Sequence, residues 1–285
     1  MSPTTKGTMI RIVTDSSSDV PAALAAEHGV TIVPLTIRFG DEEFVDHRDL
    51  SAAAFWERLV AVDRLPETAA PSAGLFEESY RALIDGGASG IVVMTISSAL
   101  SGTYQSAVIA AERLSGDVPI KIIDSRTVGM GLGLPVLDTA RFAAGGPSID
   151  AVVQHATDTL ASTDIVAALD TLEYLKRGGR IGSAQAFFGG LLNIKPLIGL
   201  DEGIVSPLGR VRTRSRAVAA LEERFAALGP RIRATAVFHG AAPDVDLVVE
   251  RIQRHVDHEV IVTTLGAVVG THTGPGTVGV AYLTN

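Results

Sequence analysis

Short apolar runs alternate with amphipathic segments along the first half of the chain. Runs typical of buried strands occupy residues 10–13, 30–39 with a break at Pro34, 91–94 and 120–123. Helical spacing or capping signals mark residues 19–28, 51–62, 74–84, 107–114 and a helix that opens at 129–133. Because strands that alternate with helices form right-handed βαβ units, this half predicts an α/β domain with a parallel sheet.

The pattern changes near residue 160, which divides an N-terminal domain, residues 9–160, from a C-terminal domain, residues 161–285. Strands are predicted at residues 165–169, 204–208, 235–239, 260–264 and 279–283, with helices at 149–162, 170–177, 215–228 and 243–255. This order predicts an α+β domain with a mixed or antiparallel sheet. Residues 186–199 are apolar and glycine-rich, a poor strand pattern, and are interpreted as core or as one wall of an apolar pocket.

Three polar turns, at residues 14–19, 95–106 and 124–127, each follow a predicted strand. In open parallel sheets, ligands bind beyond the carboxyl ends of the strands, so these turns are expected to share one edge and one site. The middle turn is rich in hydroxyl groups and opens a helix, which suits an anion. It contains no Lys, Arg or His, which favours a carboxylate over a phosphate. Plain helix capping by Ser and Thr is the alternative.

Composition narrows the class of protein. The 285 residues carry a formal net charge of −8, which argues against a general nucleic-acid-binding surface. The chain has no cysteine, so disulfides and thiolate metal sites are excluded. No apolar run approaches the roughly 18 residues of a membrane span, and the polar residues 1–8 do not resemble a signal peptide. A soluble, cytoplasmic protein without an integral membrane segment is expected.

Basic and glycine-rich motifs in the second half offer further candidates. Arg180 follows a glycine-terminated helix, and arginines alternate at residues 210, 212, 214 and 216. If extended, that run presents one basic face, either a solvated strand or a site for phosphate or an acidic partner. His272 lies in a Gly/Thr turn. The G-x-G-x-x-G letters at residues 274–279 precede a predicted strand rather than a helix, which argues against dinucleotide binding.

Six motifs in register resemble the DegV family, whose members include the fatty-acid-binding subunits of bacterial fatty acid kinase. The motifs lie at residues 13–19, 97–104, 123–133, 175–181, 194–196 and 272–276, and the match runs from about residue 9 to the C-terminus. The resemblance implies two α/β-type domains that enclose a fatty acid in an apolar tunnel. It implies a lipid-binding protein that is not an enzyme alone and that needs no cofactor or metal.

The resemblance also assigns site residues. The fatty-acid carboxylate is expected at Thr68 and at Ser101 with the adjoining Gly102. The chain departs from the family pattern after Thr68, where Ala69-Ala70 replaces a Ser-Gln pair. Family members linked to a kinase use basic residues near the pocket mouth for partner docking or phosphate handling, and the corresponding residues here are Arg180, Arg212 and His272.

The leading hypothesis is a carrier that presents a long-chain fatty acid to a separate ATP-dependent fatty acid kinase, a dihydroxyacetone-kinase-like protein, and holds the acyl phosphate. A kinase-independent lipid-binding or sensing protein is the first alternative. A hydrolase or phosphotransferase that uses Ser101 as nucleophile and His272 as base is the second. Burial of each methylene contributes about 0.8 kcal/mol, so in either lipid hypothesis the acyl tail dominates the affinity.

Overall fold

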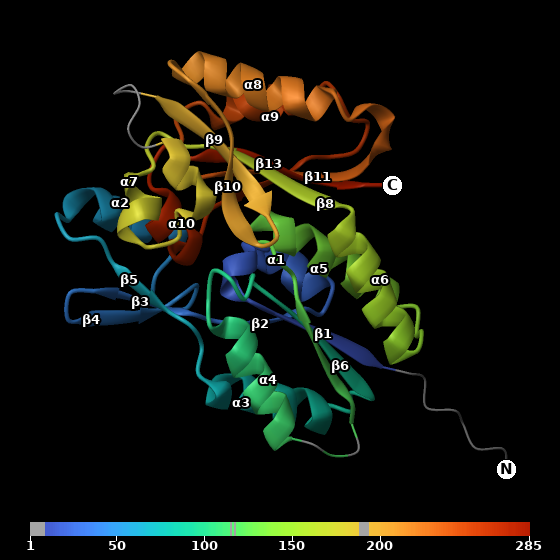
Figure 1. Cartoon of the computed structure of the whole chain (residues 1–285). Coiled ribbons are helices and arrows are strands. Elements are labelled where there is room, and N and C mark those ends of the chain that lie inside the picture. The colour runs from blue at the N-terminus through green and yellow to red at the C-terminus, as the bar shows by residue number, and fades with distance from the viewer. Residues whose placement is uncertain (1–8, 115, 117, 188–193) are drawn as a thin grey trace, which may run out of the picture.

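The computed structural model describes residues 9–114, 116, 118–187 and 194–285 (Figure 1). Its N-terminal domain is built on a parallel sheet of strand order β2-β1-β6-β7. The strands are β1 (Ile10–Asp15), β2 (Thr31–Val33), β6 (Gly90–Thr95) and β7 (Ile120–Asp124). The surrounding helices are α1 (Ala22–Glu27), α3 (Ala73–Asp85), α4 (Thr103–Arg113), α5 (Met130–Ala143) and α6 (Ile149–Ala161). The predicted βαβ organisation and parallel sheet are confirmed.

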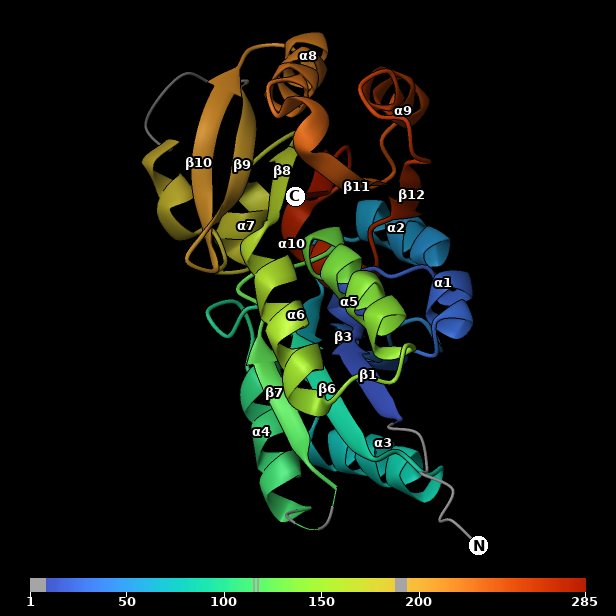
Figure 2. The ribbon, with the colours of Figure 1, turned by 90° about the vertical axis from the view of Figure 1, so that its right-hand side faces the viewer.

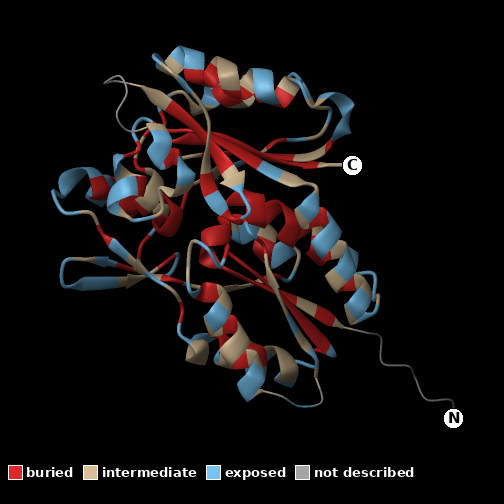
Figure 3. Cartoon of the chain, viewed as in Figure 1, coloured by how far each residue is buried: buried red, intermediate tan, exposed pale blue. Residues whose placement is uncertain are grey.

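Each face of this sheet is covered by helices, which explains its continuous apolar strands. Phe76 and Tyr80 of α3 and Ala107 of α4 pack on one face, whereas α5 and α6 pack on the other. Nearly the whole of α5 is buried because it lies between this sheet and the second one (Figures 2 and 3). A helix that is apolar on all sides is typical of such a position.

The C-terminal domain has a six-stranded mixed sheet of order β10-β9-β8-β13-β11-β12. Only β11 and β12 pair in parallel, and the other neighbours pair antiparallel. The strands are β8 (Thr163–Ala168), β9 (Lys195–Asp201), β10 (Ile204–Val211), β11 (Ile232–His239), β12 (Ile261–Thr264) and β13 (Val278–Thr284). The helices are α7 (Glu173–Arg177), α8 (Arg214–Ala226), α9 (Val245–Gln253) and α10 (Ala267–Thr273). Helices α8 and α9 cover the outer face, and the mixed sheet agrees with the prediction (Figure 2).

A small third sheet links the two halves. It contains β3 (Thr36–Phe39), β4 (Glu42–Val45) and β5 (Glu67–Ala69). Helix α2 (Ala52–Ala61) lies between β4 and β5 in the chain. The indole N–H of Trp56 on α2 donates to the Leu265 carbonyl at 3.1 Å, just before α10. One buried core therefore unites residues from both sides of residue 160, and the domain boundary proposed there stays a prediction.

Several sequence expectations were wrong in detail. Residues 41–43, expected as a loop, form the turn and first part of strand β4. Residues 186–199 were judged a poor strand, yet 195–201 form β9; residues 188–193 lie outside the described part of the chain. The four arginines from 210 to 216 do not share an extended face, because β10 ends at Val211 and α8 begins at Arg214. The Thr213 hydroxyl accepts a hydrogen bond from the Arg216 amide and caps the start of α8.

Candidate functional site

The three polar turns meet at the carboxyl edge of the parallel sheet, as predicted. The Asp15 carboxylate accepts a hydrogen bond from the Ile96 amide at 2.8 Å, and the Ser97 amide donates to the Thr127 carbonyl at 2.9 Å. The Ser98 amide donates to Asp124 at 3.0 Å. Burial raises the pKa of Asp15, although the hydrogen bonds that its carboxylate accepts from Ser17 and Ile96 oppose the shift. These polar groups therefore bind the loops to one another and form the framework of the site.

Asp19 connects this edge to the C-terminal domain. Its carboxylate accepts a hydrogen bond at 2.8 Å from the amide of Gly266, the residue that precedes α10. Burial raises the pKa of Asp19 well above its ordinary value. The contact fixes α10, which carries His272, against the N-terminal domain.

A cavity of about 150 Å³ lies between the two domains. From the N-terminal side, its walls include Ile96 and Leu100 in the β6–α4 loop. From the C-terminal side, they include Ile165 on β8, Leu200 on β9 and Val268 on α10. Since one water molecule needs about 10–15 Å³ of such space, the cavity accommodates on the order of ten water-sized or methylene-sized groups. It is therefore suited to an elongated apolar ligand.

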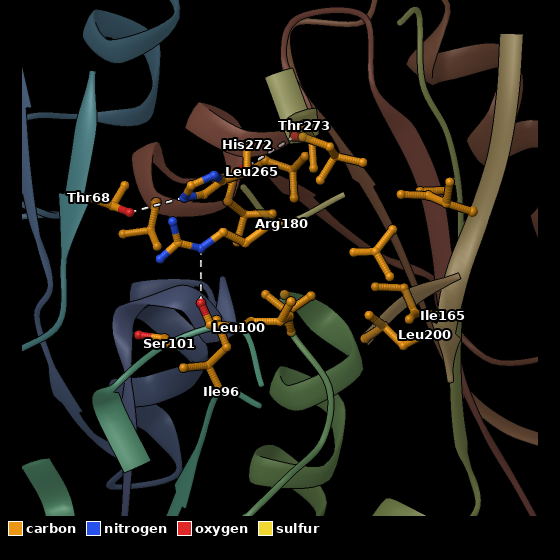
Figure 4. A pocket seen from close by; sticks show the side chains of 18 of the residues that line it. Thr68, Ile96, Leu100, Ser101, Ile165, Arg180, Leu200, Leu265, His272 and Thr273 are labelled. Atoms are coloured by element: carbon orange, nitrogen blue, oxygen red, sulfur yellow. Dashed lines mark hydrogen bonds between the residues drawn. The ribbon is translucent and has the colours of Figure 1, made fainter. Parts of the chain in front are cut away.

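Polar side chains gather at one end of this cavity (Figure 4). Thr68 on β5 and His272 on α10 are joined by a hydrogen bond of 3.0 Å between Oγ1 and Nε2. Arg180, which follows α7, donates to the carbonyls of Leu100 at 3.2 Å and Gly178 at 2.7 Å. Figure 4 places Ser101 below this group and Ile165 with Leu200 on the opposite side. The cavity thus has a polar end and an apolar end.

His272 is neutral at the polar end. Burial, together with the nearby Arg180 charge, lowers the pKa of His272 from 6.5 to about 4. Its Nδ1 is buried and has no hydrogen-bond partner among the described residues, so we assign the proton to Nε2. Nε2–H then donates to the Thr68 oxygen, which leaves the Thr68 hydroxyl hydrogen available to an acceptor in the cavity.

Gly178 permits the close packing of His272. A Cβ atom at this position would lie 2.2 Å from His272 Nδ1, so any side chain would displace the imidazole. From the sequence alone, glycines 178 and 179 are explained as the C-terminal cap of a helix. In the structure, Gly178 also makes room for His272.

Ser101 and Gly102 lie at the start of α4, where the hydroxyl cluster was expected. The Ser101 hydroxyl accepts from the Thr103 amide at 3.3 Å and lies 2.9 Å from the Thr103 hydroxyl. Ser101 and Gly102 both line the cavity. The neighbouring Ser97 instead donates to the Gly203 carbonyl and does not line the cavity, so only part of the hydroxyl cluster faces the cavity.

The predicted site residues fall into two groups. Thr68, Ser101, Gly102, Arg180 and His272 line the cavity, although they come from four separate parts of the chain. Arg212 is exposed between β10 and α8 and does not line it.

The structure also bears on the nucleophile hypothesis. Ser101 and His272, both in described segments, are not hydrogen-bonded to each other, because Ser101 contacts Thr103 and His272 contacts Thr68. The Ser–His bond that activates a hydroxyl nucleophile is therefore not formed here. Across the described residues, no cluster of three or more His, Cys, Asp or Glu side chains is arranged to hold a metal ion. Within the same residues, no helix is long and apolar enough to cross a membrane.

Sequence reasoning missed most of the apolar lining. Ile165, Ala167 and Val205 come from the inner face of the six-stranded sheet and have the sequence pattern of ordinary core. Ile198, which also lines the cavity, falls within residues 186–199, the stretch interpreted as core or pocket wall. No local signal separates a side chain that packs on another side chain from one that faces a cavity. The strand β9, which supplies Ile198 and Leu200, was itself not predicted.

Comparison with known proteins agrees with this architecture. Residues 9–285 match the family model described as an uncharacterised protein of the DegV family. A DegV domain-containing protein of Streptomyces coelicolor is 40% identical over 275 residues, which cover 95% of this chain and 97% of that protein.

Solved structures extend the comparison to the fold. A fatty-acid-binding DegV family protein from Thermus thermophilus superimposes with a TM-score of 0.90 at 32% identity, covering 97% of this chain and 100% of that one. DegV from Bacillus subtilis, described as a fatty acid binding protein, gives a TM-score of 0.87 at 27% identity, with 98% and 100% covered. By sequence and by fold, the chain belongs to the DegV family.

Proposed function

We propose that the protein binds a long-chain fatty acid in the cavity between its domains. The observation that carries the proposal is the division of the cavity into a polar end, with Thr68, Ser101, Arg180 and His272, and a lining that apart from Thr273 is otherwise apolar. The fatty acid bound by the T. thermophilus relative and the stearic acid bound by a Eubacterium ventriosum protein of TM-score 0.87 and 25% identity support it.

The polar end matches the requirements of a carboxylate. Burying a charged carboxylate costs several kcal/mol unless hydrogen bonds and an opposite charge offset the cost. The Thr68 hydroxyl hydrogen, the Ser101 hydroxyl and the start of α4 supply donors, and the Arg180 guanidinium supplies the charge. Each methylene buried along the apolar walls adds about 0.8 kcal/mol, so the tail contributes most of the affinity and the polar end sets the orientation.

We further infer that the carboxylate is presented to a separate ATP-dependent fatty acid kinase, with the acyl phosphate held afterwards. An outer depression of about 410 Å³ adjoins the polar end and shares Thr68, Arg180 and His272 with the cavity. Arg64 and Arg177 also line it; Arg64 forms an ion pair with Glu67 of the same lining, so Arg177 and Arg180 are the cations that suit it to phosphate. A kinase-independent lipid-binding role is the alternative.

A binding experiment tests the lipid proposal. Protein stripped of lipid is titrated with palmitate, and the double variant Thr68→Val/Ser101→Ala is compared with Ser98→Ala, which removes a hydroxyl of the same loop outside the cavity. Loss of two hydrogen bonds to a charged group is expected to weaken binding on the order of 100-fold, while Ser98→Ala binds as the wild type does. Equal affinity of the double variant would refute the assignment.

A second assay separates the kinase-linked role from its alternative. Lipid-loaded protein is incubated with ATP and the fatty acid kinase of the same organism, and acyl phosphate is measured. Arg212 does not line the cavity, so Arg212→Ala is expected to leave lipid binding unchanged. If Arg212 contributes to docking of the kinase, the variant is expected to form less acyl phosphate. Tight lipid binding without any acyl phosphate would favour the kinase-independent role.

A further inference from the structure

The apolar end of the cavity is closed by two side chains, Ile165 and Leu200 (Figure 4). A separate surface groove of about 380 Å³ lies on their far side and is also lined by both residues. No other residue is shared between the cavity and this groove among those that line the two. Ile165 and Leu200 are therefore the partition between them.

The partition is held in place from both domains. Leu200 is the second-last residue of β9. In the β9–β10 turn that follows Asp201, the Gly203 carbonyl accepts a hydrogen bond from Ser97 at 2.8 Å and Glu202 forms an ion pair with Arg126. Gly203 has a φ of +81°, and a Cβ there would lie 2.4 Å from the Ser97 hydroxyl oxygen, so the turn requires glycine. These contacts fix the tip of the hairpin on the N-terminal domain.

Ile165 is equally constrained. It is 8% exposed and belongs to the core shared by both domains. Gly131 of α5 packs beside it: a Cβ built at Gly131 would lie 3.5 Å from the Ile165 Cβ, which is ordinary van der Waals contact. A partition held between the two domains in this way limits the length of a ligand anchored at the opposite end.

Beyond the partition, the groove offers a surface on which more methylenes could lie. Ile123, Leu160 and Ala161 line it together with the partition, whereas the rest of its lining is largely polar and includes Asp124, Arg126, Asp164 and Glu202. An acyl chain that passed the partition would therefore meet a few apolar side chains beside polar and charged groups.

We propose that Ile165 and Leu200 set the upper limit of acyl-chain length. The inference rests on the proposed function, in which the carboxylate is anchored at Thr68 and Ser101. Truncation of either partition residue joins the cavity to the groove and lets a longer tail extend. Val205 lines the cavity but not the groove, so its truncation widens the cavity without opening that end.

The experiment measures affinities for a series of saturated fatty acids that differ by two carbons. Each methylene buried changes the dissociation constant about fourfold, and Leu→Ala removes three carbon atoms. For Leu200→Ala, we expect the preferred chain to lengthen by about two carbons, with the longer acid gaining about 16-fold relative to the shorter one. Leu200→Phe, which adds bulk, is expected to keep the limit or shorten the preferred chain.

The controls keep the outcomes separate. Ile165→Ala is expected to shift the chain-length preference in the same direction. Thermal melts establish that each variant is folded. Because Leu200 is only half-buried, its truncation is expected to destabilise the fold less than that of Ile165. An unchanged length profile in folded Leu200→Ala, or an equal shift in Val205→Ala, would overturn the proposal while wild-type binding still upheld the proposed function. Failure of the wild type to bind any acid in the series would instead refute the proposed function.

Discussion

Protonation of His272 gives a quantitative test of the polar end of the cavity. Burial and the nearby Arg180 lower the pKa of His272 from 6.5 to about 4 in the folded protein. Between these two pH values, the unfolded chain binds a proton at this position and the folded chain does not. Stability therefore falls as the pH drops through this window, and the loss is complete near the folded pKa. The change from 6.5 to about 4 corresponds to about 3 kcal/mol.

The variant His272→Gln isolates this effect. Glutamine retains a hydrogen-bond donor toward Thr68 but does not titrate. Burial raises the pKa values of Asp15, Asp19 and Asp46, which gives an opposite pH dependence, but these carboxyl groups are present in both proteins. Their contributions therefore cancel when the two proteins are compared at each pH.

The assay is urea unfolding of lipid-free wild type and His272→Gln from about pH 7 to about pH 4. The free energy of unfolding of the wild type is expected to fall by about 3 kcal/mol relative to the variant over this range. NMR titration of the His272 ring provides the direct reading, and a bound carboxylate is expected to raise its pKa by offsetting Arg180. Parallel pH profiles, or a lipid-free His272 that titrates near 6.5, would refute the buried neutral imidazole.

Two further substitutions test the packing around the site and the C-terminal domain. Gly178→Ala places a methyl group 2.2 Å from His272 Nδ1 and so displaces the imidazole. Titration calorimetry should then show at least tenfold weaker fatty-acid binding. Unchanged affinity would contradict the close packing of His272 on Gly178. Arg214→Leu breaks a half-buried ion pair with Asp244, at 2.7 Å, and should lower the free energy of unfolding by about 2–4 kcal/mol in urea unfolding. The exposed control Arg48→Leu should leave the unfolding midpoint close to that of the wild type. Equal effects of the two arginine variants would argue against the structural role of Arg214.

The N-terminal domain was predictable because its signals are local. The run at 91–94 is bounded by a turn and a helix start, and β6 spans Gly90–Thr95. The three polar turns could be assigned to one edge because parallel strands end together. In contrast, β5 consists of Glu67, Thr68 and Ala69, which have no strand pattern of their own and pair with β3 only in the folded chain.

The candidate site was predictable only in part, for a related reason. The hydroxyl cluster at Ser101 followed from the order of strand and helix, but the bond between Thr68 and His272 joins residues 204 positions apart. The role of Thr68 came from the family resemblance and not from its neighbours in sequence. Burial, which determines both the pKa of His272 and the closure of the cavity by Leu200, depends on tertiary packing that no local pattern contains.

Mass spectrometry of an organic extract tests the central claim most directly. The purified protein is denatured and extracted, and the fatty acids released are identified and counted per chain. The account predicts a long-chain fatty acid that is retained in stoichiometric amount by the wild type and depleted in Thr68→Val/Ser101→Ala. An extract without fatty acid, followed by failure of the stripped protein to take up acids of several lengths, would contradict it.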